Sequence, residues 1–133
     1  MVTAHLLIVE DDPDLLRVLS LLLQRANLAI DTAQSAQSAI LACQRQLPHL
    51  IILDLGLSQS QGLDLLEWLR QSEISTLPVL VIYTARDLFE NELQDLQAFT
   101  SHIFTKSRIS PTEFRQQIFA LLDEQVERSH PSG

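Results

Sequence analysis

Acidic side chains follow two short apolar runs of this sequence, and together they could form a site for a hard cation. Glu10, Asp11 and Asp12 come directly after the first run. Asp54 comes directly after the second run, Leu50–Leu53. Continuous apolar runs of this length are typical of strands that are buried on both faces of a parallel sheet. Ligands bind at the carboxyl ends of such strands, and clustered carboxylate oxygens are the ligands that Mg²⁺ prefers.

Helix capping explains part of this cluster without any chemistry. Asp12 is followed by Pro13, and this pair is favourable as the N-cap and the first residue of a helix. Glu10 and Asp11 are not explained in this way, because adjacent like charges are unfavourable unless a cation or a base offsets them. The acids alone leave a metal site and simple capping as equal alternatives.

Five apolar strand candidates alternate with helical patterns, which indicates βα units and an α/β fold with a parallel sheet. The strands are expected at Leu6–Glu10, Leu28–Thr32, Leu50–Asp54, Val79–Thr84 and His102–Thr105. The helices are expected at Pro13–Ala26, Ser35–Gln46, Leu63–Ser72, Asp87–Phe99 and Pro111–Arg128. Ser110 and Glu113 predict a capping box at the start of the last helix. The first helix carries leucines on more than one stripe, and we expect deep burial rather than a partner contact.

Length and composition limit the function classes. With 133 residues the chain should form one domain, which we place at residues 1–128, followed by a tail at 129–133. The net charge of −8 argues against direct binding of nucleic acid, which needs clustered Lys and Arg. The single Cys43 is expected to be a buried, inert thiol. Since neither a membrane span nor a signal peptide is evident, we expect a cytoplasmic protein that makes no membrane contact.

The strand ends together carry a more specific set of residues than the acids alone. They are Glu10 and Asp11, Asp54, Thr84 and Lys106. A doubly wound sheet brings such ends together at its carboxyl edge. The set would support phosphoryl transfer to a carboxylate, with Asp54 as the nucleophile and the other acids holding Mg²⁺. The metal, Lys106 and the Thr84 hydroxyl would neutralise the charge that develops on the phosphoryl oxygens.

Four motifs cover nearly the whole chain in a recognisable order. They are Val9–Pro13, Leu53–Leu57 with Gly62, Tyr83–Ala85 and Phe104–Lys106. Asp54 lies 43 residues after Asp11, Thr84 lies 30 residues after Asp54, and Lys106 lies 22 residues after Thr84. These spacings are jointly far more specific than any single motif. In them the chain resembles the receiver domain of two-component response regulators.

The resemblance implies a flavodoxin-like, doubly wound (βα)₅ sandwich whose five-stranded parallel sheet has the order 2-1-3-4-5. It implies that Asp54 accepts a phosphoryl group from a phosphohistidine of a histidine kinase or histidine phosphotransfer protein. Asp11 would be a direct Mg²⁺ ligand and Glu10 would act through water. Asp54 itself and the backbone carbonyl of Gly56 would complete the metal site. The module would signal rather than act as an enzyme.

Thr84 and Lys106 would contact the phosphoryl group once it is attached. The switched surface, and a possible homodimer interface, would be the face formed by the fourth helix, the fifth strand and the fifth helix. Several positions depart from the family. Ser58 and Ser107 stand where proline is usual, and Ile103 replaces the usual aromatic residue of the switch. The segments around Thr84 and Lys106 look similar to receivers of hybrid kinases and relay proteins.

Other functions remain open at this point. Aspartate-nucleophile phosphatases also use a strand-end Asp with Mg²⁺, but they need a second acid two residues later, where this chain has Gly56. A scaffold that keeps the site but lacks the switch is suggested by Ile103 and Ser107. Flavin binding is the weakest alternative, because no Gly/Ser/Thr-rich phosphate loop follows the first strand.

Overall fold

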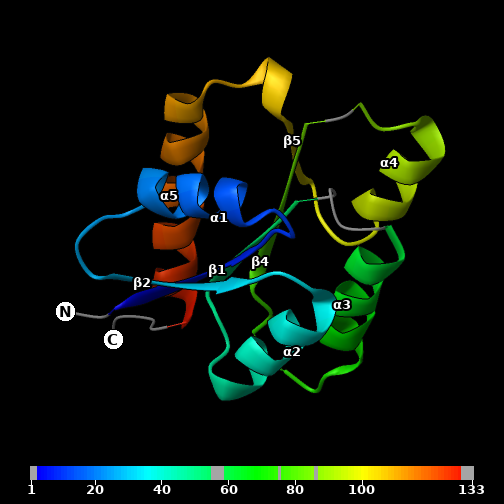
Figure 1. The fold of residues 1–133 in the computed structure, drawn as a ribbon. Helices are drawn as coiled ribbons and strands as arrows, with labels where there is room; N and C mark the ends of the chain where they lie inside the picture. Colours follow the sequence, from blue (N-terminus) through cyan, green and yellow to red (C-terminus); the bar gives the residue numbers. More distant parts are fainter. Residues whose placement is uncertain (1–2, 55–58, 75, 86, 130–133) are drawn as a thin grey trace.

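The structure is a computed structural model that describes residues 3–54, 59–74, 76–85 and 87–129, apart from the side chains of residues 59–61. Strands and helices alternate along this chain. They are β1 (Ala4–Val9), α1 (Pro13–Leu22), β2 (Leu28–Ala33), α2 (Ala36–Arg45), β3 (Leu50–Leu53), α3 (Gln59–Gln71), β4 (Val79–Thr84), α4 (Glu90–Gln97), β5 (His102–Thr105), the short 3₁₀ helix η1 (Lys106–Arg108) and α5 (Pro111–Ser129). The five strands form one parallel sheet in the order β2-β1-β3-β4-β5, as predicted (Figure 1).

The centre of the sheet is fully buried. Every residue of β3 has no measurable exposure, and β1 is buried along most of its length. In the register of the sheet, Val9 pairs with Leu53 and Leu53 pairs with Ile82. The carboxyl ends of β1, β3 and β4 therefore lie side by side at one edge, where the acids follow the first two strands.

The helices form two layers, one on each face of the sheet (Figure 1). α1 and α5 cover one face, where Leu16, Leu19, Phe114 and Ile118 are buried against the sheet. α2, α3 and α4 cover the other face, and Cys43 is buried there as expected. Each large side chain fully buried in these layers contributes about 1.5–3 kcal/mol to folding. The packed layers hold the residues at the carboxyl edge of the sheet in fixed positions.

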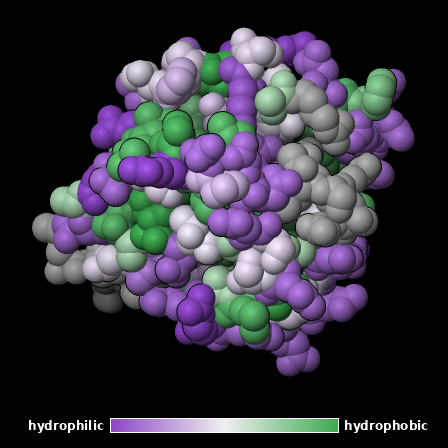
Figure 2. All heavy atoms as spheres, viewed as in Figure 1, coloured by the Kyte–Doolittle hydropathy of each residue, from purple (hydrophilic) through white to green (hydrophobic). Residues whose placement is uncertain are grey.

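Helix α1 is less deeply buried than the sequence predicted. Leu16 and Leu19 face the sheet, whereas Leu15, Val18 and Leu21 are 42%, 59% and 61% exposed. The apolar residues extend around the helix, but the sheet and α5 can cover only one side of it. Figure 2 shows apolar side chains at the surface around α1. An unpaired apolar stripe therefore lies on α1, and we call Leu15, Val18 and Leu21 the α1 stripe.

Helix boundaries differ from the prediction where local geometry overrides periodicity. α1 ends at Leu22 rather than at Ala26, with Leu23 as its C-cap. Asn27, directly before β2, takes a left-handed conformation (φ 60°). α3 begins at Gln59, before the predicted Leu63. The sequence did not indicate this first turn, because its residues are polar and show no apolar period.

The two C-terminal helices also begin at capped residues. α4 begins at Glu90 rather than at Asp87, since Phe89 is extended and its amide donates to Glu92 Oε1 at 3.2 Å. The predicted capping box of α5 is confirmed: the Glu113 amide donates to Ser110 Oγ at 3.1 Å. The helix extends to residue 129, and residues 130–133 of the expected tail lie outside the described residues. No helix in the described ranges is long and apolar enough to cross a membrane.

Candidate phosphoacceptor site

Asp54 and Lys106 are in direct contact at the carboxyl edge of the sheet. The Asp54 amide donates to the Val9 carbonyl at 3.0 Å, which fixes Asp54 beside the end of β1. Lys106, the first residue of η1, donates from Nζ to Asp54 Oδ2 at 2.6 Å. The side chains of Asp54 and Lys106 are only 6% and 21% exposed, so this charge-assisted hydrogen bond is largely shielded from water.

Glu10 is the most constrained acid of the site. It follows β1 and is 1% exposed. Its Oε1 accepts a hydrogen bond from the Asp12 amide at 3.0 Å, whereas Oε2 is buried and has no hydrogen-bond partner in the described structure. Burial, followed by the nearby Asp54 carboxylate, raises the pKa of Glu10 to about 8, although the Asp12 amide opposes this effect. A buried oxygen of this kind needs a proton, a water molecule or a cation beside it.

The two neighbouring acids, Asp11 and Asp12, differ in their surroundings. Asp12 is the N-cap of α1, and its Oδ1 accepts from the Asp14 amide at 2.9 Å, as predicted. Asp11 is exposed and close enough to Glu10 to contribute to the raised pKa of that carboxyl. Thr84 ends β4 and is 1% exposed.

These residues fit Mg²⁺ in charge and in ligand chemistry. Glu10, Asp11 and Asp54 outnumber the single ammonium group of Lys106, so an added dication would reduce their mutual repulsion. Within the described ranges no three His, Cys, Asp or Glu side chains are arranged to enclose a metal ion. Mg²⁺ is usually held by one or two carboxylates, with water and phosphate oxygens as the other ligands. Gly56, predicted to offer a carbonyl to the metal, lies outside the described residues.

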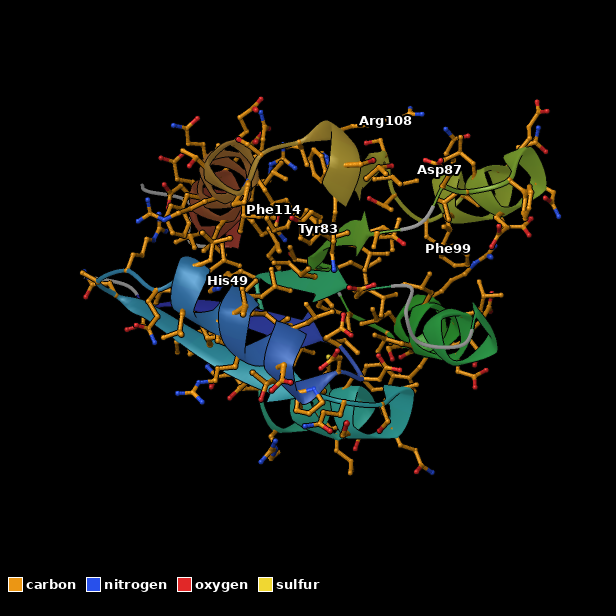
Figure 3. The ribbon with its side chains drawn as sticks, turned by 45° about the horizontal axis from the view of Figure 1, so that its top comes forward. His49, Tyr83, Asp87, Phe99, Arg108 and Phe114 are labelled. Carbon is orange, nitrogen blue, oxygen red and sulfur yellow. The ribbon has the colours of Figure 1, made fainter. Side chains whose placement is uncertain are left out.

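The switch position Ile103 lies on the α4 side of β5. It packs against the core below α2, α3 and α4 and, with Asp87 and Arg108, lines a hollow of about 290 Å³ (Figure 3). Phe104 faces the opposite side, as the alternation of a strand predicts, and packs towards α5. Lys106–Arg108 form η1, and no peptide bond in the described ranges is cis.

Sequence reasoning gave Tyr83 no role beyond packing, yet it lies beside the site. The ammonium of Lys106 lies over the Tyr83 ring, 5.0 Å from its centroid. Burial raises the pKa of Tyr83; Lys106 opposes that effect and Asp54 adds to it. The available signal in the sequence was the place of Tyr83 immediately before Thr84, but only the pairing of β4 with β5 puts it next to Lys106.

Comparison with known proteins agrees with this geometry. Residues 6–119 match the response regulator receiver domain family. The chain belongs to this family. The receiver domain is 40% identical over 100 residues to the "Probable transcriptional regulatory protein TcrX" of Mycobacterium tuberculosis, covering 75% of this chain and 42% of that protein. It is 35% identical over 102 residues to the virulence transcriptional regulatory protein PhoP of Shigella flexneri, covering 77% and 45%.

Solved structures share the fold. A signal receiver domain from Vibrio parahaemolyticus superposes with a TM-score of 0.82 at 23% identity, covering 99% of both chains. A CheY-like receiver domain protein from Methanospirillum hungatei gives 0.77 at 22% identity, covering 95% and 98%. The receiver domain spans less than half the length of the curated relatives named above. Those relatives are transcriptional regulators by name, and the similarity to hybrid-kinase receivers stays a prediction.

Proposed function

We propose that this receiver domain accepts a phosphoryl group on Asp54 from a phosphohistidine of a histidine kinase or histidine phosphotransfer protein. The observation that carries the proposal is the shielded 2.6 Å contact between Asp54 and Lys106 beside the buried Glu10. A nucleophilic carboxylate, a fixed cation and spare carboxylate oxygens are the parts that phosphoryl transfer to an aspartate needs. The acceptor then works as the input of a signalling module.

The transfer itself exchanges one bond for another. A carboxylate oxygen of Asp54 attacks the phosphorus, the N–P bond of the phosphohistidine breaks, and its electron pair stays on the imidazole nitrogen. The product is an acyl phosphate on Asp54. Lys106 is already beside the nucleophile and would follow the phosphoryl oxygens, while the Thr84 hydroxyl would donate to them.

Glu10, Asp11 and Asp54, with the carbonyl of Gly56, would hold Mg²⁺ in this scheme. When bound, the ion would supply charge neutralisation on the phosphoryl oxygens. The orphaned Glu10 Oε2 supports this assignment, because it needs either a proton or a cation. Phosphorylation would add a charge of about −1.5 to −2 at the sheet edge, and Lys106 would interact with the added phosphoryl oxygens.

A protein donor also needs a surface on which to land. The α1 stripe begins one turn after the acids and leaves three apolar side chains open to solvent. We infer that the phosphohistidine-bearing protein docks there, since apolar surface next to a reaction site is typical of a partner contact. A Val18→Asp change should slow transfer from a phosphorylated histidine phosphotransfer domain, but not from a small donor. Equal slowing with both donors would contradict this docking site.

The test of phosphorylation uses Mg²⁺ and acetyl phosphate as the donor. Intact-protein mass spectrometry should show one added phosphoryl group on the wild type and none on Asp54→Asn or after chelation of Mg²⁺. Asp64→Asn, which removes an exposed acid from α3, is the matched control and should react like the wild type. A wild type that takes up no phosphoryl group would instead favour the scaffold without a switch.

Other features of the proposal rest on the resemblance to the family. The homodimer through α4, β5 and α5, the cytoplasmic location and the relay subtype stay predictions. The output surface should include Ile103 and the hollow beside it, since this part of β5 lies next to Lys106. An isoleucine cannot act as an aromatic switch, and the response of this surface must differ from the family pattern.

A further inference from the structure

An aromatic stack connects Lys106 to helix α5 on the face of the sheet opposite Ile103. Tyr83 and Phe104 are register partners on β4 and β5. The Tyr83 ring is stacked on the Phe114 ring, with centroids 3.8 Å apart and planes 11° apart. Phe104 meets Phe114 edge to face at 5.8 Å and 81°. Figure 3 shows Tyr83 at the end of β4, next to Phe114 of α5.

The outer face of this stack is occupied by the Lys106 ammonium. Nζ lies 5.0 Å from the centroid of Tyr83, within the range of a cation–π contact, and donates to Asp54 Oδ2 at 2.6 Å. Lysine has a long and flexible side chain, and holding it in one rotamer costs conformational entropy. A ring fixed below the ammonium restricts the Lys106 side chain to conformations in which Nζ lies near Asp54.

The ring is itself held firmly. Tyr83 is 6% exposed and Phe114 is fully buried in the α1–α5 layer. The stacking with Phe114 prevents the Tyr83 ring from turning its edge towards Lys106. A positively charged group is attracted to the face of an aromatic ring and not to its edge, so the orientation matters.

We propose that Tyr83 is a positioning residue whose ring face, fixed by Phe114, holds the Lys106 ammonium against Asp54. The competing explanation is that Tyr83 is only a large core residue, for which a branched aliphatic side chain would serve equally well. The two explanations differ in whether an aromatic face is needed. The effect on phosphorylation rests on the proposed function, but the effect on the position of Lys106 does not.

The first test measures the wild type without any phosphodonor. Protons above an aromatic ring are shifted upfield, so the Lys106 ε-methylene protons should lie upfield of those of an exposed lysine in the NMR spectrum. In Tyr83→Phe the upfield shift should persist, and in Tyr83→Leu it should vanish. An unshifted Lys106 signal in the wild type would overturn the proposal, even if the variants did not fold.

The second test measures the rate of phosphorylation by acetyl phosphate with Mg²⁺. Tyr83→Leu should slow the reaction by about five- to thirtyfold, the range expected for a partly desolvated cation–π contact. Tyr83→Phe should restore the rate to within about twofold of the wild type. Phe104→Leu is the matched control, because it removes an aromatic ring from the same stack at a position two residues before Lys106.

The outcomes separate the two proposals. If Tyr83→Leu reacts as fast as the wild type, or if Tyr83→Phe is as slow as Tyr83→Leu, the ring face has no positioning role. If the wild type does not react at all, the proposed function fails, and the NMR shift alone then decides whether Tyr83 positions Lys106. Thermal unfolding of each variant should show that it is folded under the assay conditions.

Discussion

At the scale of single residues, the demands of burial and of function conflict most at Glu10. Its carboxylate is buried beside Asp54, and one oxygen has no hydrogen-bond partner in the described structure. Such a group lowers the stability of the metal-free domain. If the proposed Mg²⁺ binds beside Glu10, it would offset this cost.

Replacing Glu10 by glutamine should therefore have opposite effects on stability and on metal binding. Without Mg²⁺, Glu10→Gln should increase the free energy of unfolding by about 1–3 kcal/mol, because a neutral amide group is less costly to bury and its NH₂ can donate towards Asp54. The increase in melting temperature produced by Mg²⁺ should shrink, since a ligand stabilises only as far as it binds the folded state. Thermal and urea unfolding with and without Mg²⁺ measure both effects.

An exposed acid supplies the control for this substitution. Glu67 lies on α3, where its carboxylate is 3.9 Å from Arg70 and half exposed. Glu67→Gln should change the free energy of unfolding by less than about 0.5 kcal/mol and leave the response to Mg²⁺ intact. A Glu10→Gln domain that is less stable than the wild type without metal would contradict our interpretation of Glu10.

Residue types and spacing anticipated much of this site. The sequence predicted Asp54 and Lys106, 52 residues apart, at the same edge of the sheet, and their side chains are in contact there. Asp12 was predicted to cap a helix, and in the structure it is the N-cap of α1. The role that we propose for Tyr83 could not be anticipated, because it depends on the direction of a ring and not on its position along the chain.

At the scale of the elements, capping determines where α5 begins. The Glu113 amide donates to Ser110 Oγ at 3.1 Å, while the return bond from the Ser110 amide to Glu113 Oε1 is longer, at 3.4 Å. The serine hydroxyl is therefore the stronger half of the box. This helix also carries Phe114, the lower ring of the aromatic stack.

Ser110→Ala should lower the free energy of unfolding by about 0.5–2 kcal/mol, because it leaves the Glu113 amide of α5 without its side-chain acceptor. Urea unfolding followed by circular dichroism measures the change. Ser107→Ala, an exposed serine in η1, should have a much smaller effect. If the two variants are equally stable, the hydroxyl of Ser110 does not cap the helix in solution.

Strand alternation and helix periodicity differed in how much they could predict. The period of two separated Ile103 from Phe104 correctly, since successive side chains of a strand must face opposite sides. The leucines of α1 were expected to be buried, but Leu15 and Leu21, two of the five, are exposed. A leucine count indicates how apolar a helix is and does not indicate how much of it the neighbouring layers cover.

At the scale of the whole molecule, Cys43 links the core to the pH dependence of stability. It lies on the buried face of α2 and is 5% exposed, and burial raises the pKa of its thiol from 9.0 to about 11. In the unfolded chain the thiol ionises at the lower pH, so the unfolded state loses its proton first. The stabilisation is complete below pH 9 and is lost as the pH rises towards 11.

We therefore expect the ionisation of Cys43 to lower the free energy of unfolding by about 2–3 kcal/mol as the pH rises from 9.0 to about 11. Cys43→Ala should remove this part of the slope while it lowers stability equally at all pH values through the small cavity it creates. Tyr83 contributes in the same direction, because burial raises its pKa as well, and some slope should remain. Urea unfolding at several alkaline pH values measures the difference, and identical slopes would contradict the assignment to Cys43.

Local patterns predicted the alternation of strands and helices, because buried parallel strands and capped helices leave strong signals along a chain. The strand order and the roles of the site residues were expected from the resemblance to receiver domains. The tertiary structure decided the rest. The exposed α1 stripe, the orphaned oxygen of Glu10 and the ring of Tyr83 beneath Lys106 all depend on which surfaces meet across the layers. Coverage, desolvation and ring orientation are properties of pairs of distant residues, and no single segment of the sequence encodes them.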